Sequence, residues 1–420
     1  TQEEPTGTRK PDELLESDEE IEGLVQGGAI GSIVVGATFS LLASNPSGLW
    51  LMLNTIQLLT YISLSSNPLT PTLRGFFKGL NLAIKIPSIF DILMEESQSP
   101  NPNKYSSEYG FESGLFLVNA GFTIMVFCIL LVTWPLVWVL SNSKTAYVQK
   151  VFKFLLEKYK FTLLLRLWIQ SYLDTAIVCF IQLSFFSGIE RVVVNNIIAA
   201  VVAAGLLIAT PIAISVFFYR KKDQLESTTE ESTVYKEYGT LFYELKYKDE
   251  FKACFTYVFF TLQRLLFAAS LVFLGNYPYL QASINCAVML FFAGFTVVVR
   301  PYEDKTMRVV SMFVESGTFL IFLAVIYFLE SDPKDYQGVV EAVVIYSAFG
   351  VTALRMLSVF LKLGFKIYDY FKEKNTAQVQ PEVTVVETSN YQQTIDHTPG
   401  WILSSDYPVF ARVKKQLGKF

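Results

Sequence analysis

The chain has 420 residues, of which 52% are hydrophobic, 15% aromatic and only 17% charged, and its formal net charge is −4 at pH 7. Soluble proteins carry about 25% charged residues, so this composition and a mean hydropathy of +0.38 indicate a protein that lies mainly in lipid. They exclude a disordered chain, a disulfide scaffold and a nucleic-acid-binding domain, which needs an excess of basic residues.

The first element is an acidic segment, residues 1–23, with nine Asp and Glu residues. It is either a solvated extracellular linker or a collar that collects cations, and both interpretations stay open. The sequence starts at Thr1, without a methionine or a secretory signal. We therefore expect a processed piece or fragment that an outward-facing ectodomain precedes.

Nine apolar stretches follow, each long enough to cross a bilayer, because about 20 helical residues at 1.5 Å each span its hydrocarbon core. They predict an all-α, polytopic membrane protein with a transmembrane domain over 24–372. The tightest connection is a hairpin in which Gly275 suits a helix end and Pro278 the first turn of the next helix. The nine stretches are 24–44, 48–66, 113–140, 165–187, 193–219, 252–275, 277–299, 308–329 and 338–361.

Other segments mix charged and apolar residues. Residues 73–94 carry four charges and Pro87, so we expect an interfacial or re-entrant segment rather than a tenth span. In 148–165 and 234–252, lysines alternate with Phe, Leu or Tyr at helical spacing, which predicts helices on the cytosolic membrane surface. These helices either couple membrane tension or lipid charge to the spans or are ordinary loops. Residues 373–420 are expected to form a polar cytosolic tail with a basic end.

The Lys and Arg residues predict the orientation. If the N-terminus is outside and nine helices follow, most of the 34 Lys and Arg residues lie in the inner loops and the tail. Cytosolic loops of membrane proteins carry this excess of positive charge. We therefore expect an odd number of spans, with the N-terminus outside and the C-terminus in the cytosol.

The charged residues expected within the spans are Asp174, Arg264, Glu315 and Arg355, together with Glu341, which is close enough to the outer end of its span to be interfacial. A charged side chain at the bilayer centre costs at least about 2.5–3.5 kcal/mol, so each suggests a function or a partner. One interpretation is a structural ion pair, Arg264–Glu315 or Arg355–Glu315, that locks helix packing. The other is a hydrophilic ion path with Glu315 and Asp174 in its walls.

Uncharged polar residues also recur in the predicted spans. Most are expected to form interhelical hydrogen bonds, which are worth about 0.6 kcal/mol each. Their number exceeds what a passive anchor needs. They are Asn54, Gln57, Asn119, Gln170, Gln182, Asn195, Asn196, Gln263 and Asn285.

The cysteines and the histidine narrow the chemistry further. Cys128, Cys179, Cys254 and Cys286 each lie in a long apolar run without CxxC spacing, which favours buried thiols over disulfides or zinc ligands. The single histidine, His397, lies in the polar tail. No Walker A motif and no GxGxxG followed by a helix occurs. We expect no metal site, no cofactor and no enzymatic activity.

Several motifs occur in a characteristic order between about residues 50 and 370. They are LWLMLNTIQLLTYISL, NPLTPTLRGFF, KFTLLLRLWIQSYLD, YGTLFYELK, the pair Gln263 and Arg264, YPYLQ, VVVRPYEDK and Glu315. In this order they resemble the transient-receptor-potential-like multi-span region of the fungal flavin-carrier and Spray proteins. A related region closes large cysteine-rich surface proteins of ciliates and apicomplexans. The chain departs from the pattern at Tyr243, where the family usually has an acid.

The resemblance implies a nine-span module behind an outward ectodomain, in a group described as cation or calcium channels and as membrane anchors. It supplies no pore motif. The outer loops GNYPY and ESDPKDYQG are too short for a pore loop with a filter. A conducting path would then run between the helices of one subunit or at a seam between subunits.

Three functions are weighed. The first is a cation channel, and the second is a non-conducting anchor or assembly subunit for a large extracellular protein or complex. The third, a lipid or solute transporter, predicts an inverted repeat that is not found. The expected partners are the lipid bilayer, an extracellular ectodomain or filament and a second copy of the chain, with no nucleic acid. The expected location is a plasma, ciliary or secretory-organelle membrane of a protist.

Overall fold

The computed structural model describes the greater part of the chain. The described ranges are 47–66, 69–80, 113–157, 163–184, 191–226, 238–242, 245–247, 251–329 and 336–379, with Gly23, Val25, Gly27, Ile89, Phe90 and Phe111. Nearly all of the predicted first span 24–44 and of the acidic segment 1–23, together with residues 380–420, lies outside them. The chain divides into two compact units, Thr1–Ile367 and Tyr368–Phe420.

Within the described ranges, seven helical segments are long and apolar enough to cross a membrane, and they confirm seven of the nine predicted stretches. The chain is therefore a multi-pass integral membrane protein. The segments are Gly121–Ser141 (α6), Leu164–Ser184 (α8), Val193–Leu225 within α9 (Arg191–Glu226), Phe251–Phe273 comprising η5 (Phe251–Phe255) and α11 (Thr256–Phe273), Pro278–Val299 (α12), Lys305–Tyr327 (α13) and Gln337–Leu361 within α14 (Gln337–Val379). Since α14 continues to Val379, its helix extends past the predicted domain boundary at residue 372.

The predicted stretch 48–66 forms a shorter apolar helix. It consists of α2 (Ser47–Thr60) and the 3-10 turn η1 (Tyr61–Leu64). Its apolar part, Trp50–Leu64, is shorter than the seven spans above, so it does not reach their length for crossing a bilayer. Met52, Ile56 and Leu59 of α2 are nevertheless fully buried.

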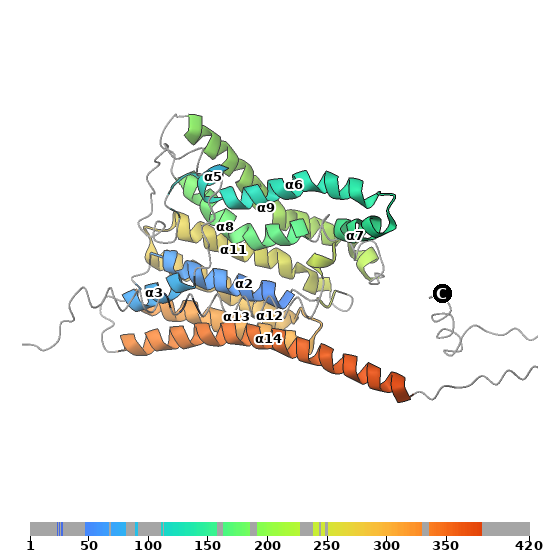
Figure 1. The fold of residues 1–420 in the computed structure, drawn as a ribbon. Coiled ribbons are helices and arrows are strands. Elements are labelled where there is room, and N and C mark those ends of the chain that lie inside the picture. The colour runs from blue at the N-terminus through green and yellow to red at the C-terminus, as the bar shows by residue number, and fades with distance from the viewer. Residues whose placement is uncertain are drawn as a thin grey trace, which may run out of the picture. The chain divides into compact units, whose positions relative to one another are not determined.

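Two helices, α8 and α11, form the centre of the bundle. Figure 1 shows them between α6 and α9 on one side and α2, α12 and α13 on the other. Most residues of both are buried, whereas α6 exposes large apolar side chains such as Leu131, Val132 and Trp138. A helix that is apolar on all sides is stable in lipid, because no water is present to demand a polar face.

The segment predicted as interfacial or re-entrant contains α3 (Pro71–Gly79). Thr70 caps this helix by accepting a hydrogen bond from the backbone N–H of Leu73 at 3.3 Å. Phe76 and Phe77 are buried, and the Phe76 ring contacts that of Phe349 in α14 at 5.4 Å between centroids. The described part of this segment therefore packs against its neighbours, and its position in the membrane stays a prediction.

The two predicted surface helices differ. Residues 148–165 begin in α7 (Ala146–Glu157), an amphipathic helix that follows α6. The described part of 234–252 is not a continuous helix: it forms the 3-10 turn η4 (Gly239–Leu241), an isolated antiparallel bridge between Leu245 and Tyr302, and the start of η5. The residues described between Gly239 and Tyr247 therefore do not form the predicted helix, and Leu241, Phe242 and Leu245 among them are buried, whereas residues 234–237 lie outside the described residues.

Candidate functional site

The first charged group joins α13 to α14. Nη2 of Arg355 lies 3.0 Å from Oε1 of Glu315, and Nη1 donates to Oγ of Ser311 at 2.9 Å. Arg355 is 1% exposed and Glu315 16% exposed, so the pair is shielded from solvent. Of the two predicted ion pairs, Arg355–Glu315 is the one in direct contact.

The second group joins α8 to α2 and η1. The hydroxyl of Tyr61 donates to Oδ1 of Asp174 at 2.6 Å, and the amide of Gln57 donates to Oδ2 at 3.2 Å. The same amide nitrogen donates to the backbone carbonyl of Gln170 at 3.2 Å. Asp174 is thus held by donors from another helix rather than by a direct ion pair.

Arg264 of α11 lies between these two groups. It interacts electrostatically with both Glu315 and Asp174 but forms a salt bridge with neither. Its Nη2 donates to the backbone carbonyl of Asn54 at 3.3 Å, and its guanidinium lies over the Phe260 ring, 3.4 Å from the centroid. Only 3% of Arg264 is exposed, and its Nε has no acceptor among the described residues.

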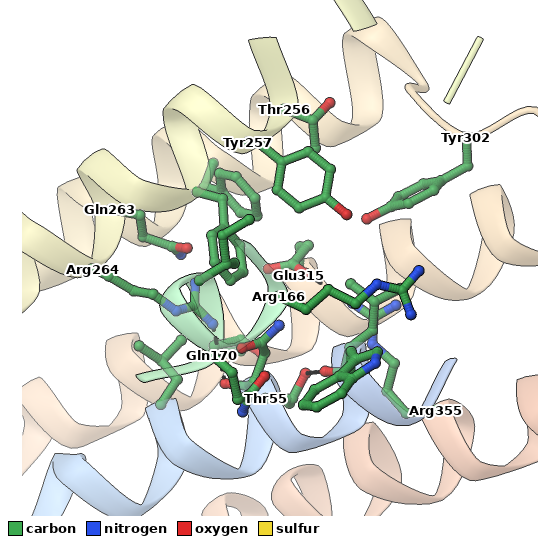
Figure 2. A pocket seen from close by; sticks show the side chains of 18 of the residues that line it. Thr55, Arg166, Gln170, Thr256, Tyr257, Gln263, Arg264, Tyr302, Glu315 and Arg355 are labelled. Carbon is green, nitrogen blue, oxygen red and sulfur yellow. Dashed lines mark hydrogen bonds and ion pairs between the residues drawn. The ribbon is translucent and has the colours of Figure 1, made fainter. Parts of the chain in front are cut away.

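These groups surround a partly enclosed cavity of about 80 Å³ (Figure 2). A water molecule needs roughly 10–15 Å³ of such space, so the cavity has room for a group larger than one water. Side chains from α2, α8, α11, α12, α13 and α14 line it, together with Leu245 and Tyr302 from connecting segments. Its charged lining residues are Arg166, Arg264, Arg355 and Glu315.

Of the charged and polar residues predicted within the spans, the fold places Asn54, Gln170, Gln263, Arg264, Glu315 and Arg355 at this cavity. Asp174 and Gln57 lie beside it, through their contacts with Arg264 and Gln170. The amide of Gln263 lies 3.0 Å from Sδ of Met289 in α12.

Asn285 and Asn119 are predicted residues that lie elsewhere. Oδ1 of Asn285 accepts a hydrogen bond from Oγ of Ser270, which joins α12 to α11. The amide of Asn119 donates at 2.6 Å to the carbonyl of Ser113 in the preceding turn. This bond is local, because Asn119 ends the short helix α5 (Phe116–Asn119), which interrupts the predicted span 113–140.

Several cavity residues were not predicted as site residues. Arg166 lies in the first turn of α8, and Figure 2 shows its side chain extended into the cavity. Trp50, Tyr257 and Tyr302 also line the cavity. Tyr302 follows the α12 helix end in VVVRPYEDK, and its bridge to Leu245 pairs it with a segment far away in the sequence. The sequence signal that could have indicated Arg166 is its position in the motif KFTLLLRLWIQSYLD, close to the start of a helix.

The two carboxylates proposed as walls of an ion path are both engaged with donors from other elements. Glu315 is bonded to Arg355, and Asp174 to Tyr61 and Gln57. Among the described residues, no group of three or more His, Cys, Asp and Glu side chains could hold a metal ion. Among the described residues, the lining contains three guanidinium groups and one carboxylate, and a second carboxylate, that of Asp174, interacts electrostatically with Arg264 beside it.

No family model, no curated protein and no solved structure matches the chain. The function is therefore argued from the charges, donors and packing of the site.

Proposed function

We propose that the chain is a transient-receptor-potential-like cation channel module in which the buried polar network couples the movements of its helices. The observation that carries this proposal is the position of Arg264 between the carboxylates of two other helices, Asp174 of α8 and Glu315 of α13. A passive anchor has no need of such a network, since a packed apolar core would hold the helices as well.

The network offers two discrete arrangements. Arg264 has a long hydrogen bond to Asn54 and an unpartnered Nε, so its present contacts leave hydrogen-bonding capacity unused. A small shift of α11 toward α8 or toward α13 would give it a direct carboxylate partner. Two-state elements of this kind are what gating movements require.

The conducting path lies outside the arginine-lined cavity under this proposal. Both acids near the cavity already have donors, Glu315 from Arg355 and Asp174 from Tyr61 and Gln57, so neither is open to coordinate a passing cation. The short outer loops left two routes for cations, between the helices of one subunit or at a seam between subunits. We propose the seam between subunits.

Electrical recording on the purified full chain in planar bilayers tests the proposal. We expect cation currents under voltage, tension or lipid challenge, and a reversal potential that follows the cation gradient. Asp174→Asn should change open probability, because it weakens the link between α8 and η1, while leaving the cation-to-anion permeability ratio unchanged. Absence of current from protein that is folded and inserted would overturn the proposal.

A non-conducting anchor is the second candidate, favoured by the engagement of both carboxylates. It predicts no current in the same bilayers. It also predicts that Asp174→Asn lowers the stability of the protein and changes nothing else. Recording currents and measuring the stability of this one variant therefore distinguishes the two candidate functions.

A further inference from the structure

We propose that the arginine-lined cavity is a binding site for an uncharged glycerol headgroup, presented by a monoacylglycerol or by free glycerol. The headgroup would sit among Trp50, Asn54, Arg264 and Arg355. This inference goes beyond ion conduction, since it concerns the hydrogen-bonding groups of one cavity that the protein leaves unused.

The unused hydrogen-bonding groups come from α2, α11 and α14. The indole nitrogen of Trp50 and the Nε atoms of Arg264 and Arg355 are buried donors without an acceptor among the described residues. Oδ1 of Asn54 is a buried acceptor without a donor among them. All four residues line the cavity, and the two arginines and Asn54 are more than nine-tenths buried. A buried polar group without a partner is costly, and a ligand that pairs with it removes that cost.

The ligand needs no charge. Arg355 is bonded to Glu315 at 3.0 Å, and Arg264 interacts electrostatically with Glu315 and with Asp174. Each of these two arginines therefore has a carboxylate nearby that offsets its charge. What each guanidinium lacks is an acceptor for its Nε–H, and an uncharged oxygen supplies one.

The donors are too many for a ligand with a single oxygen. One hydroxyl or carbonyl oxygen has two lone pairs, so it cannot accept from three donors. A lone carbonyl also has no O–H to donate to Asn54. A glycerol headgroup carries several oxygens, and its hydroxyls both accept and donate. The lining residues Thr55, Thr256 and Thr318 do not compete for it, because each hydroxyl donates to a backbone carbonyl three or four residues earlier.

The spacing on α2 suits two neighbouring hydroxyls. Trp50 and Asn54 are four residues apart, so their side chains lie on the same face of α2, about 6 Å apart along its axis. One side chain offers a donor and the other an acceptor. A glycerol headgroup would bridge them by accepting from Trp50 and donating to Asn54.

The size and walls of the cavity suit a headgroup rather than a whole lipid. Its volume of about 80 Å³ corresponds to roughly five to eight water positions at about 10–15 Å³ each. Leu51, Phe260 and Phe292 form an apolar part of the lining, which an acyl chain would contact as it leaves the partly enclosed cavity. Ligand sites commonly combine such apolar walls with a few placed polar groups.

The test measures binding to the full chain in detergent micelles by native mass spectrometry, which gives the dissociation constant and the number of ligands bound. Three probes share the decanoyl chain and differ at its end: monodecanoylglycerol carries the glycerol, methyl decanoate lacks the hydroxyls, and decanoate is negatively charged. Free glycerol is the fourth probe.

Two variants remove one hydrogen-bonding group each. Trp50→Phe removes the indole donor and keeps an aromatic ring, and Asn54→Leu removes the amide acceptor at similar volume. Trp168→Phe is the control for the first, since Trp168 donates to Oγ1 of Thr210 and does not line the cavity. Asn285→Leu is the control for the second, since Asn285 is also buried and lies outside the lining.

We expect one monodecanoylglycerol to bind per chain, at least about tenfold more tightly than methyl decanoate or decanoate, because it alone adds hydroxyls without a charge. Trp50→Phe and Asn54→Leu should each weaken its binding about three- to tenfold, as expected for one lost hydrogen bond. Trp168→Phe and Asn285→Leu should leave it unchanged. Asn54→Leu should bind methyl decanoate as the unaltered chain does, since that probe has no hydroxyl, whereas a misfolded variant would lose both probes.

The comparison with free glycerol identifies the source of the headgroup. Much tighter binding of monodecanoylglycerol than of glycerol identifies a lipid, and equal binding identifies free glycerol.

The proposal is overturned if neither monodecanoylglycerol nor glycerol binds, or if decanoate or methyl decanoate binds as tightly as monodecanoylglycerol. It is also overturned if the two variants weaken binding no more than their controls, or if Asn54→Leu weakens methyl decanoate equally. Because no current is recorded, failure of this inference and failure of the channel proposal are separate outcomes.

Discussion

Arg355 and Arg264 are both buried in the bundle, but different contacts compensate for the burial of their charges. Arg355 meets Glu315 and Ser311 directly, so two of its three nitrogens have acceptors. Arg264 relies on a backbone carbonyl and the face of Phe260. A cation above an aromatic ring gains about 2 kcal/mol or more when it is desolvated, which offsets part of the cost of burying Arg264.

A double-mutant cycle measures how much the Arg355–Glu315 pair contributes to the free energy of unfolding. Arg355→Met should lower the free energy of unfolding by about 3–5 kcal/mol, because it leaves the Glu315 carboxylate buried without its partner. Combining it with Glu315→Leu should recover most of this loss, since both charges are then gone. Unfolding in mixed micelles measures both effects.

Arg300→Met serves as the control, because Arg300 is exposed and should change stability by no more than about 0.5 kcal/mol. A double variant as unstable as Arg355→Met alone would contradict the pairing and assign the role of Arg355 to Ser311 or to packing.

At the scale of elements, α13 and α14 approach closely at one glycine. A Cβ added to Gly317 would lie 2.6 Å from Cγ2 of Val351, closer than real Cβ atoms come to a neighbour. The β-branched Val351 has little rotamer freedom in a helix, so it cannot simply turn away. The close approach also sets the spacing across which Arg355 of α14 reaches Glu315 of α13.

Gly317→Ala should therefore destabilise the protein by about 1–3 kcal/mol through overpacking. Gly350→Ala is the matched control: it lies in α14 next to Val351, and a Cβ there meets nothing within 4 Å. This control should be neutral or gain up to about 1 kcal/mol from helix propensity. Thermal unfolding in detergent compares the two, and equal behaviour would show that the helices do not depend on this contact.

At the scale of the whole molecule, the alternation of spans predicts which connections share a side of the membrane. Lys144 follows α6 and Lys305 begins α13, with four candidate spans between them, so both should face the same side. Tyr277 lies between α11 and α12, one span before Lys305, and should face the other.

Single cysteines at these three positions, in a chain with Cys128→Ala, can be labelled in sealed vesicles with a membrane-impermeant maleimide. Lys144→Cys and Lys305→Cys should react from one side and Tyr277→Cys from the other. Labelling of Lys144→Cys and Lys305→Cys from opposite sides would contradict the path of the chain through the membrane.

The sequence by itself determined the class of protein and seven of its spans, because a helix in lipid needs an apolar stretch of fixed length and nothing else to define it. It also indicated which charged residues matter, since a charge in such a stretch stands out. It did not determine the structure between Gly239 and Tyr247, where the alternation of lysines and aromatics suggested a helix but the described residues form a 3-10 turn and a bridge.

Only the tertiary structure decided which charges meet. Glu315 could have paired with Arg264 or Arg355, and helix position alone allowed both, but the packing of α13 on α14 selected Arg355. Arg166 and Tyr302 joined the cavity through a helix start and a bridge far away in the sequence. The physical reason is that span length is a local property of the chain, whereas the charge inside a cavity depends on the rotation and spacing of several helices at once.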